Sequence, residues 1–251
     1  MDLLEVESGD NPRHPWEICR LNFFSKLVAQ TLPAKTHTKI LDAGAGDGWL
    51  SQELSKKLSI EHKIVCWDAN YTPEFLEQTK STQHSGLEFS LDRPASTFDL
   101  ILMLDVLEHV ENDNLFLNRL VSENLIDGGT VVISVPAWSF LFSSHDRHLK
   151  HFRRYTPSAV RNLLTSNGLK VLRSGGLFHS LVLPRAFQII RELCFKKFPE
   201  NKGVGVWRGS PLTTKIIIAV LSADNKFSER LSRLGISVPG LSWWAVCQKI
   251  S

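Results

Sequence analysis

The sequence predicts an α/β fold built on a parallel sheet, and three observations support this prediction. Short β-compatible apolar runs alternate with segments whose apolar residues recur at helical spacing. The stretch ILDAGAGDGWLS at 40–51 places glycines directly between one such run and one such helix. The chain has 251 residues, of which 43% are apolar, so it can bury one α/β core. A single domain over 1–251 is therefore expected.

The predicted elements alternate along the front of the chain. Strands are expected at 39–43, 63–68, 87–91, 98–104 and 130–135, and helices at 15–31, 48–58, 73–80, 112–124 and 157–166. The last helix has Thr156 as its N-cap and Pro157 at its first position, and it should end near Gly168. Two further strands, at 169–173 and 241–249, close the chain.

The glycines of 40–51 lie on the turn between the first strand and its helix. Alternate glycines let backbone N–H groups approach a ligand closely, and Asp68 after the second strand suits a ribose diol, which offers two donors. A dinucleotide fingerprint would need a third glycine at position 49, where this chain has Trp49. Asp42 below the turn would repel a diphosphate but could accept an ammonium group. The pattern therefore favours a ligand with a ribose and an amino acid, S-adenosylmethionine, over a nicotinamide dinucleotide.

Several motifs in this order resemble the class I, Rossmann-like S-adenosylmethionine-dependent methyltransferases. They are DAGAGDG at 42–48, Asp68, and FDLILMLDVLEHV at 98–110. HPWEICR at 14–20, SVPAWSFLFSSHD at 134–146 and HFRRYTPSAVRNLL at 151–164 resemble a bacterial subgroup associated with glycosyltransferases of envelope and lipid-linked sugar pathways. The resemblance covers residues 12–176. It implies a doubly wound, seven-stranded, mostly parallel sheet with an antiparallel last strand, S-adenosyl-L-methionine as cofactor and S-adenosyl-L-homocysteine as product.

The predicted cofactor contacts gather at the carboxyl ends of the strands, where such sheets bind ligands. The expected cofactor-binding residues are Arg20, Asp42, Gly44, Ala45, Gly46, Asp68, Ala69, Asp92, Leu104, Asp105 and His109. By the resemblance, Asp92 lies near the adenine and the backbone of Leu104 and Asp105 borders the methionine. Arg20 belongs to an N-terminal lid helix, although a helix that only packs on the sheet would show the same pattern.

The residues expected on the acceptor side come mainly from the segment 145–155. The predicted catalytic residues are His109, His145, Asp146, Arg153, Arg154 and Tyr155. Arg153 and Arg154 could clamp a phosphate or carboxylate, with Tyr155 as a further donor. The alternative is that Arg153 and Tyr155 pin the loop to the domain, and that Glu108 and His109 only orient their own loop.

The histidines of this segment raise the question of a metal. His145, His148 and His151 repeat every three residues. Three ligands at that spacing would need an unusual backbone, and no cysteine or second carboxylate converges on them in the sequence. No metal is therefore predicted, and the four scattered cysteines indicate neither a zinc site nor a disulfide framework.

Residues 177–238 are expected to form a helical insert before the final strand, 239–251. Two stretches, 181–198 and 213–234, read as amphipathic helices with the basic residues Arg185, Arg191, Lys196, Lys197, Arg230 and Arg233. The net charge of +3 hides a division, because residues 1–144 carry 11 Lys and Arg against 21 Asp and Glu, and 145–251 carry 18 against 5. Such a division fits a phosphate-bearing acceptor or an anionic membrane, whereas two helices that only cap the sheet are the alternative.

These patterns predict methyl transfer to oxygen of a small or lipid-linked, anionic acceptor. The alternative is a non-catalytic cofactor-binding module that docks on a membrane or on a glycosyltransferase. Nucleic acid is not an expected partner, because no N/D-P-P-[YF] motif follows the fourth strand. The N-terminus is acidic where a secretory signal would be basic, and no apolar run approaches ~20 residues, so a cytoplasmic location is expected, with peripheral contact at the inner membrane face through the basic helices. The oligomeric state is left open.

Overall fold

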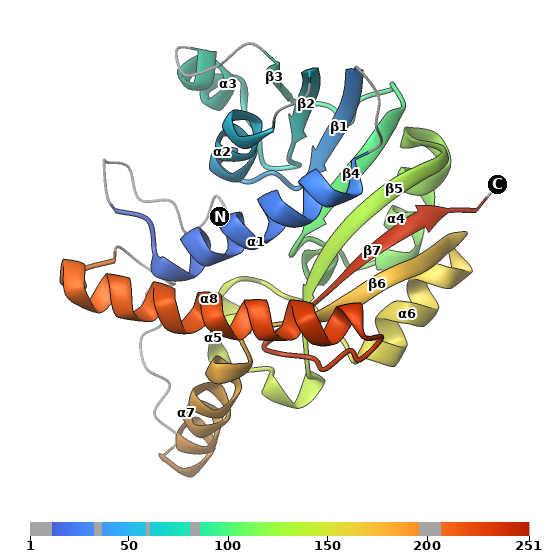
Figure 1. Ribbon diagram of the computed structural model, residues 1–251. Helices are drawn as coiled ribbons and strands as arrows, with labels where there is room; N and C mark the ends of the chain where they lie inside the picture. The colour runs from blue at the N-terminus through green and yellow to red at the C-terminus, as the bar shows by residue number, and fades with distance from the viewer. Residues whose placement is uncertain (1–11, 33–36, 59–60, 81–85, 196–206, 251) are drawn as a thin grey trace.

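The protein consists of a single seven-stranded sheet with helices on both faces (Figure 1). The computed structural model describes residues 12–32, 37–58, 61–80, 86–195 and 207–250. The strands are β1 (His37–Ala43), β2 (Glu61–Trp67), β3 (Leu87–Ser90), β4 (Phe98–Leu104), β5 (Leu125–Pro136), β6 (Leu169–Leu177) and β7 (Ser242–Lys249). Their order across the sheet is β3-β2-β1-β4-β5-β7-β6. The pairs among β1 to β5 are parallel, whereas β7 runs antiparallel to both β5 and β6. The predicted fold class is confirmed.

The helices connect these strands and cover both faces of the sheet. They are α1 (Pro15–Thr31), α2 (Trp49–Lys57), α3 (Pro73–Thr79), α4 (Asp113–Asn124), α5 (Ser144–His148), α6 (Pro157–Ser166), α7 (Val182–Phe195) and α8 (Pro211–Arg233), with short 3-10 turns η3 (Leu107–His109), η4 (Ser139–Leu141) and η5 (His179–Leu181). The α1 helix starts with a capping box between His14 and Glu17. Each of α3, α6 and α8 starts with a hydroxyl N-cap followed by proline.

The apolar strands separate two cores, one on each face of the sheet. On one face, α4 and α6 contribute leucines such as Leu117 and Leu164 to the first core. On the other face, α1, α2 and α8 contribute Phe24, Leu54 and Leu221 to the second core. Because both faces are covered, the central strand β4 is buried almost throughout, as expected for a parallel strand.

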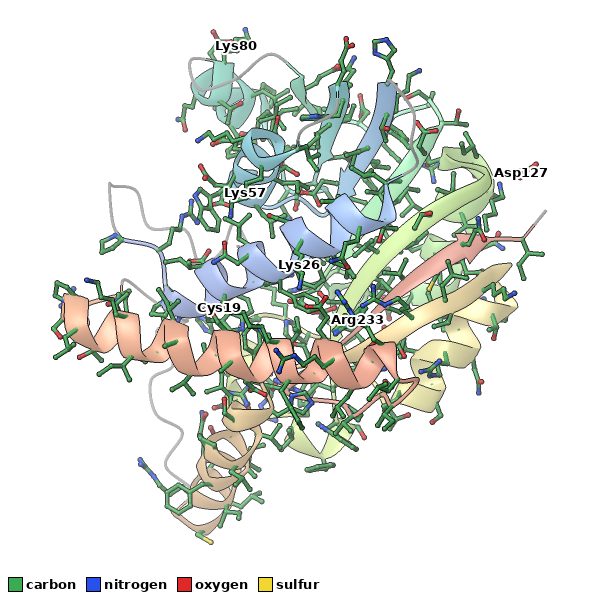
Figure 2. The ribbon with its side chains drawn as sticks, in the orientation of Figure 1. Cys19, Lys26, Lys57, Lys80, Asp127 and Arg233 are labelled. Atoms are coloured by element: carbon green, nitrogen blue, oxygen red, sulfur yellow. The ribbon has the colours of Figure 1, made fainter. Side chains whose placement is uncertain are left out.

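The segment between β6 and β7 forms η5, α7 and α8, and the two longer helices are placed differently. The α8 helix lies along β6 and α1, where Ser228 Oγ donates to the carbonyl of Gly176 at 2.6 Å. Figure 2 shows Lys26 of α1 and Arg233 of α8 near this seam, and both pair with Glu229, at 2.7 and 2.8 Å. The α7 helix instead projects away from the sheet (Figure 1). None of the helices in the described part of the chain is long and apolar enough to cross a membrane.

Candidate active site

The glycine turn after β1 has the shape that the sequence predicts. Gly44, Gly46 and Gly48 adopt left-handed backbone angles, with φ of +77°, +55° and +71°. The N–H of Gly44 donates to the carbonyl of Trp67 at 2.7 Å, as does that of Ala45 at 3.1 Å, which ties the turn to the end of β2. A Cβ at Gly44 would lie only 2.6 Å from Val106 Cγ2, so the turn also packs closely against the end of β4.

Asp68, directly after β2, faces this turn. Its Oδ2 accepts a hydrogen bond from the Gly46 N–H at 2.9 Å, and its Oδ1 accepts from the Asn70 N–H at 2.9 Å. Asn70 Nδ2 also donates to Oδ1 at 3.1 Å, and an ionised carboxylate has about four lone-pair sites, so Asp68 retains about one of them for a ribose hydroxyl. Ala69 lies beside it in an exposed turn, and Asp92 is exposed just beyond β3. The turn and Asp68 therefore fit the adenosine part of S-adenosylmethionine.

Asp42, at the end of β1, is more deeply buried than its predicted role implies. Its side chain accepts a hydrogen bond from Ser51 Oγ at 2.7 Å, and burial raises its pKa to about 6. Arg20 acts in the opposite direction and favours the ionised form. The predicted contact of Asp42 with an ammonium group stays a prediction.

The end of β4 brings Arg20 of α1 to Asp105. The Arg20 guanidinium lies 2.8 Å from one carboxylate oxygen of Asp105, and Ser134 Oγ donates to the other at 2.9 Å. Asp105 is one of few non-glycine residues with positive φ, at 60°, and such strained positions cluster at functional sites. Leu104, just before it, is buried. The segment just before α1 also reaches the glycine turn, since Arg13 pairs with Asp47 at 2.5 Å.

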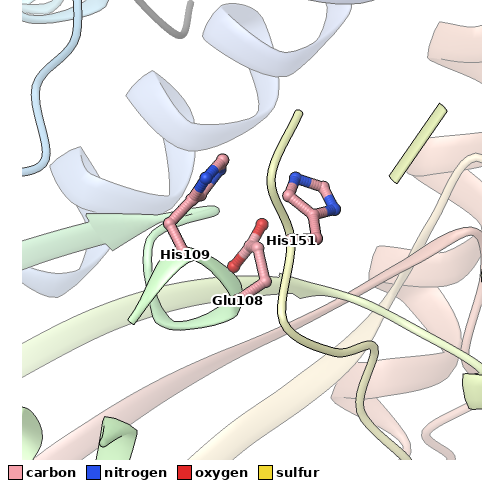
Figure 3. Close-up of side chains that lie close together, drawn as sticks. All are labelled: Glu108, His109 and His151. Atoms are coloured by element: carbon pink, nitrogen blue, oxygen red, sulfur yellow. The ribbon is translucent and has the colours of Figure 1, made fainter. Parts of the chain in front are cut away.

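A second group of polar side chains follows Asp105, where η3 meets the loop after α5 (Figure 3). The rings of His109 and His151 meet edge to face with their centroids 4.5 Å apart, and Glu108 lies beside them. The N–H of Phe152 donates to the carbonyl of Glu108 at 2.7 Å and fixes the loop against η3. Burial raises the pKa of Glu108 well above its usual range and so favours the neutral form of this carboxyl group.

These three residues also contain the atoms that could ligate a metal. One potential ligand atom from each of Glu108, His109 and His151 lies within 4.8 Å of the others. Of the three histidines spaced by threes, His145 and His148 are not part of this group. The expectation that no metal binds stays a prediction.

Asp146 of α5 is the centre of a buried charged network. Its Oδ1 lies 3.1 Å from His151 Nδ1 and 2.7 Å from Arg154 Nε, and its Oδ2 accepts from Arg185 of α7 at 3.1 Å. Burial alone would raise the pKa of Asp146, but the His151 hydrogen bond and the Arg154 charge outweigh it and hold the pKa far below its usual value. Asp146 is therefore a carboxylate that orients His151.

The other predicted acceptor-side residues have partners within the protein. Arg153 pairs with Asp113 at 2.7 Å, and the hydroxyl of Tyr155 lies 2.7 Å from Asp113 Oδ2 and 3.1 Å from the carbonyl oxygen of Leu107. The buried guanidinium of Arg154 donates hydrogen bonds to Asp146 and to the carbonyl of Ala137. An anionic acceptor would have to displace these partners, so the geometry corresponds to the alternative in which the loop is pinned to the domain. Burial and then Arg185 lower the pKa of His145 to about 4, so its imidazole is neutral.

The sequence marks His151 only as one of three possible metal ligands and not as a catalytic candidate. The spacing of five between Asp146 and His151 matches no helical or strand period, so no regular pattern marked the pair. The helix α5 ends at His148, and the following turn, with Lys150 at φ 57°, brings His151 back to Asp146.

Comparison with known proteins identifies the family. A family model described as a methyltransferase domain matches residues 17–174. The chain belongs to this methyltransferase family. Membership of this family supports S-adenosylmethionine as the predicted cofactor, and the non-catalytic module stays an alternative. The glycine turn and Asp68 would hold this cofactor, which would supply a methyl group on a sulfonium for in-line displacement.

Individual proteins are similar to this chain in sequence or in fold. A curated relative from Bartonella tribocorum (strain CIP 105476 / IBS 506), "Ubiquinone biosynthesis O-methyltransferase", is 26% identical over 161 residues, which are 57% of this chain and 64% of that protein. The chain therefore spans slightly less than two thirds of this relative. An S-adenosylmethionine-dependent methyltransferase from Mesorhizobium loti superposes with a TM-score of 0.51 at 16% identity, over 89% of this chain and 96% of that one. The [4+2]-cyclase SpnF superposes with a TM-score of 0.56 at 15% identity, over 97% and 85%. These two likenesses show the fold alone.

Proposed function

We propose that the protein methylates a hydroxyl group of a small or lipid-linked acceptor, and that His151 removes the hydroxyl proton. The observation that carries this proposal is the pair of Asp146 and His151, 3.1 Å apart. With Nδ1–H assigned as donor to the ionised Asp146, Nε2 of His151 is left as an acceptor. A carboxylate that orients an imidazole in this way is the arrangement that general-base catalysis requires.

The position of His151 supports this role. Its ring contacts that of His109, which follows Asp105 by four residues at the predicted methionine end of the cofactor site. Methyl transfer needs mainly proximity and alignment of the acceptor. A carboxylate acceptor needs no base, whereas a hydroxyl acceptor does, so a buried, oriented histidine favours a hydroxyl.

The similar proteins support the acceptor atom but not its identity. The curated relative is named an O-methyltransferase, and the motifs at 14–20 and 134–164 resemble those of the glycosyltransferase-associated subgroup. Both favour an oxygen acceptor, and the second favours one that bears a sugar or lipid. The predicted anionic group of the acceptor drew on the charge division along the chain and on Arg153 and Arg154. Both arginines are paired inside the protein, so the anionic group is not part of this proposal.

The proposal is tested by replacing the base. Purified enzyme with isotope-labelled S-adenosylmethionine is screened by mass spectrometry against phenols, catechols, polyprenyl-linked sugars and carboxylic acids. With the acceptor found, His151→Asn should lower kcat by about 10²–10⁴-fold, while the affinity for S-adenosylhomocysteine is unchanged.

The matched control is His148→Asn, because His148 is an exposed histidine of the same segment. This variant should keep the rate and pH profile of the wild type. A full rate in His151→Asn, or a screen in which only carboxyl groups become methylated, would refute the assignment.

A further inference from the structure

The outward faces of α7 and α8 carry a set of exposed apolar side chains, here named the α7–α8 surface. Its members are Leu183, Phe187, Ile190 and Leu193 of α7 and Leu212, Ile216, Val220 and Phe227 of α8. Leu183 is 78% exposed and Leu193 is 74% exposed. A run of large apolar side chains exposed along one helix is unusual for a soluble protein and marks a site of interaction with a partner or a membrane. We propose that this surface docks on an anionic lipid membrane.

Helical spacing places these residues in stripes rather than scattering them. In α8 the apolar positions follow one another at intervals of four, four and seven residues, which return to one face of a helix. In α7, Leu183, Phe187 and Ile190 are four and three residues apart and share a face in the same way. Each helix therefore has an outward apolar side in addition to the side that packs on the protein.

The charged residues of the two helices divide by sign. Among their described residues, the exposed charged side chains are all basic, namely Arg191, Lys215, Lys226, Arg230 and Arg233. The acidic residues turn inward, where Glu192 accepts from Ser144, Asp224 contacts His179 and Glu229 contacts Lys26. Lys196 and Lys197, which the sequence groups with these bases, lie outside the described residues. A surface that is apolar and basic complements anionic headgroups.

The inner faces of both helices are already occupied. The α7 helix is held to α5 by two pairs of residues. Arg185 of α7 forms an ion pair with Asp146 of α5, and Ser144 Oγ of α5 donates to Glu192 of α7 at 2.8 Å. The α8 helix is held to the end of β6, where Asn225 Oδ1 accepts from the Phe178 N–H at 3.2 Å. Because the inward faces of both helices already have partners, the exposed apolar residues do not have to turn inward to complete a core. Both helices are amphipathic and carry charges, so they would lie in the plane of the interface.

The docking surface also connects to the candidate base. Arg185 of α7 contacts the same Asp146 that orients His151, and η4, which contacts α7, exposes Phe140 to 67%. A lipid-linked acceptor would thus meet the site at the membrane surface. This consequence rests on the proposed function, whereas the docking itself does not.

Vesicle flotation of the full chain tests the docking. Vesicles of phosphatidylcholine alone are compared with vesicles that also contain phosphatidylglycerol, at low and at high salt. The chain should float with the anionic vesicles only, and high salt should weaken the binding. Lys226→Gln/Arg230→Gln should reduce the vesicle affinity by about 25-fold at low salt, or about fivefold per charge. Phe187→Gln/Ile190→Gln should reduce it by at least about tenfold.

Matched controls come from the opposite face of the sheet. Leu115 and Arg119 of α4 are exposed, so Leu115→Gln and Arg119→Gln should float as the wild type does. Equal flotation with neutral and anionic vesicles, or wild-type binding by both double variants, would overturn the proposal. Dimerisation through this surface would also overturn the proposal. In that case light scattering would show a wild-type dimer that Phe187→Gln/Ile190→Gln converts to a monomer, and the wild type would not float with vesicles. The S-adenosylhomocysteine affinity of all variants in solution should match the wild type, which separates a failure of docking from a failure of the proposed function.

Discussion

At the scale of single residues, Gly44 and Gly128 separate backbone strain from close packing. Both glycines have a left-handed φ, +77° for Gly44 and +72° for Gly128. A Cβ atom at Gly44 would lie 2.6 Å from Val106, whereas a Cβ atom at Gly128 would have no atom within 4 Å. Both Gly→Ala variants should lose about 1–2 kcal/mol for the left-handed backbone. Gly44→Ala should lose roughly a further 1–3 kcal/mol from overpacking, as measured by urea unfolding. Equal losses in the two variants would mean that the turn and the end of β4 are not packed as described.

Asp42 predicts a pH dependence of stability. Burial raises its pKa from 3.8 to about 6, so the folded state binds this proton more tightly than the unfolded state does. As pH rises from about 4 to 6, the unfolded chain loses the proton first, and the free energy of unfolding should fall. Asp42→Asn removes this loss, so the variant should gain up to about 3 kcal/mol relative to the wild type between pH 4 and 7. The exposed Asp127→Asn should keep the wild-type slope, and a pH-independent effect of Asp42→Asn would contradict the assignment.

Local sequence patterns predicted which residues of the glycine turn lie together better than they predicted the contacts of the segment 145–155. The glycines and Asp68 lie together because a tight turn and a strand end each leave a local pattern. Arg153, Arg154 and Tyr155 carry donors that suit an anion and a loop equally well. Only burial and the partners Asp113 and Asp146 distinguish the two, and no sequence period encodes them.

At the scale of elements, strand positions followed from apolar runs, while some boundaries did not. β5 begins at Leu125 rather than at 130, because Leu125 pairs with Phe98 before the register shifts. β6 continues to Leu177, beyond the predicted end at 173, because Gly175 and Gly176 pair with Trp244 and Trp243 of β7. Glycines and polar residues at these ends hide the pairing from a reading of apolar periodicity.

The attachment of α7 gives a prediction about this element. Arg185→Gln removes the charged contact with the buried Asp146 carboxylate, which loosens α7 and the support of His151. Hydrogen exchange across 182–195 should become faster, and the rate of methyl transfer should fall. Arg191→Gln, on the exposed side of the same helix, should leave exchange unchanged. Wild-type protection in Arg185→Gln would show that α7 is held by other contacts.

At the scale of the whole molecule, the sequence predicted one domain, a sheet with an antiparallel last strand, and helices before that strand. It could not predict that α8 lies along α1 while α7 projects from the body, since both stretches have similar amphipathic patterns. Their inward partners decide between the two placements, through Ser228 and Glu229 in α8 and Arg185 and Glu192 in α7. Part of the excess of basic residues in 145–251 lies on the outer sides of α7 and α8, because the exposed charged side chains of these two helices are basic.

A crystal structure of the protein with S-adenosylhomocysteine tests the central claim most directly. The ribose hydroxyls should bind Asp68 beside the glycine turn, and the sulfur should lie near Leu104 and Asp105. The sulfur should face the space in front of His109 and His151, where an acceptor hydroxyl would be aligned with the leaving methyl group. A ligand bound away from Asp68, or a sulfur directed away from the two histidines, would contradict both the cofactor site and the role of His151 as the base.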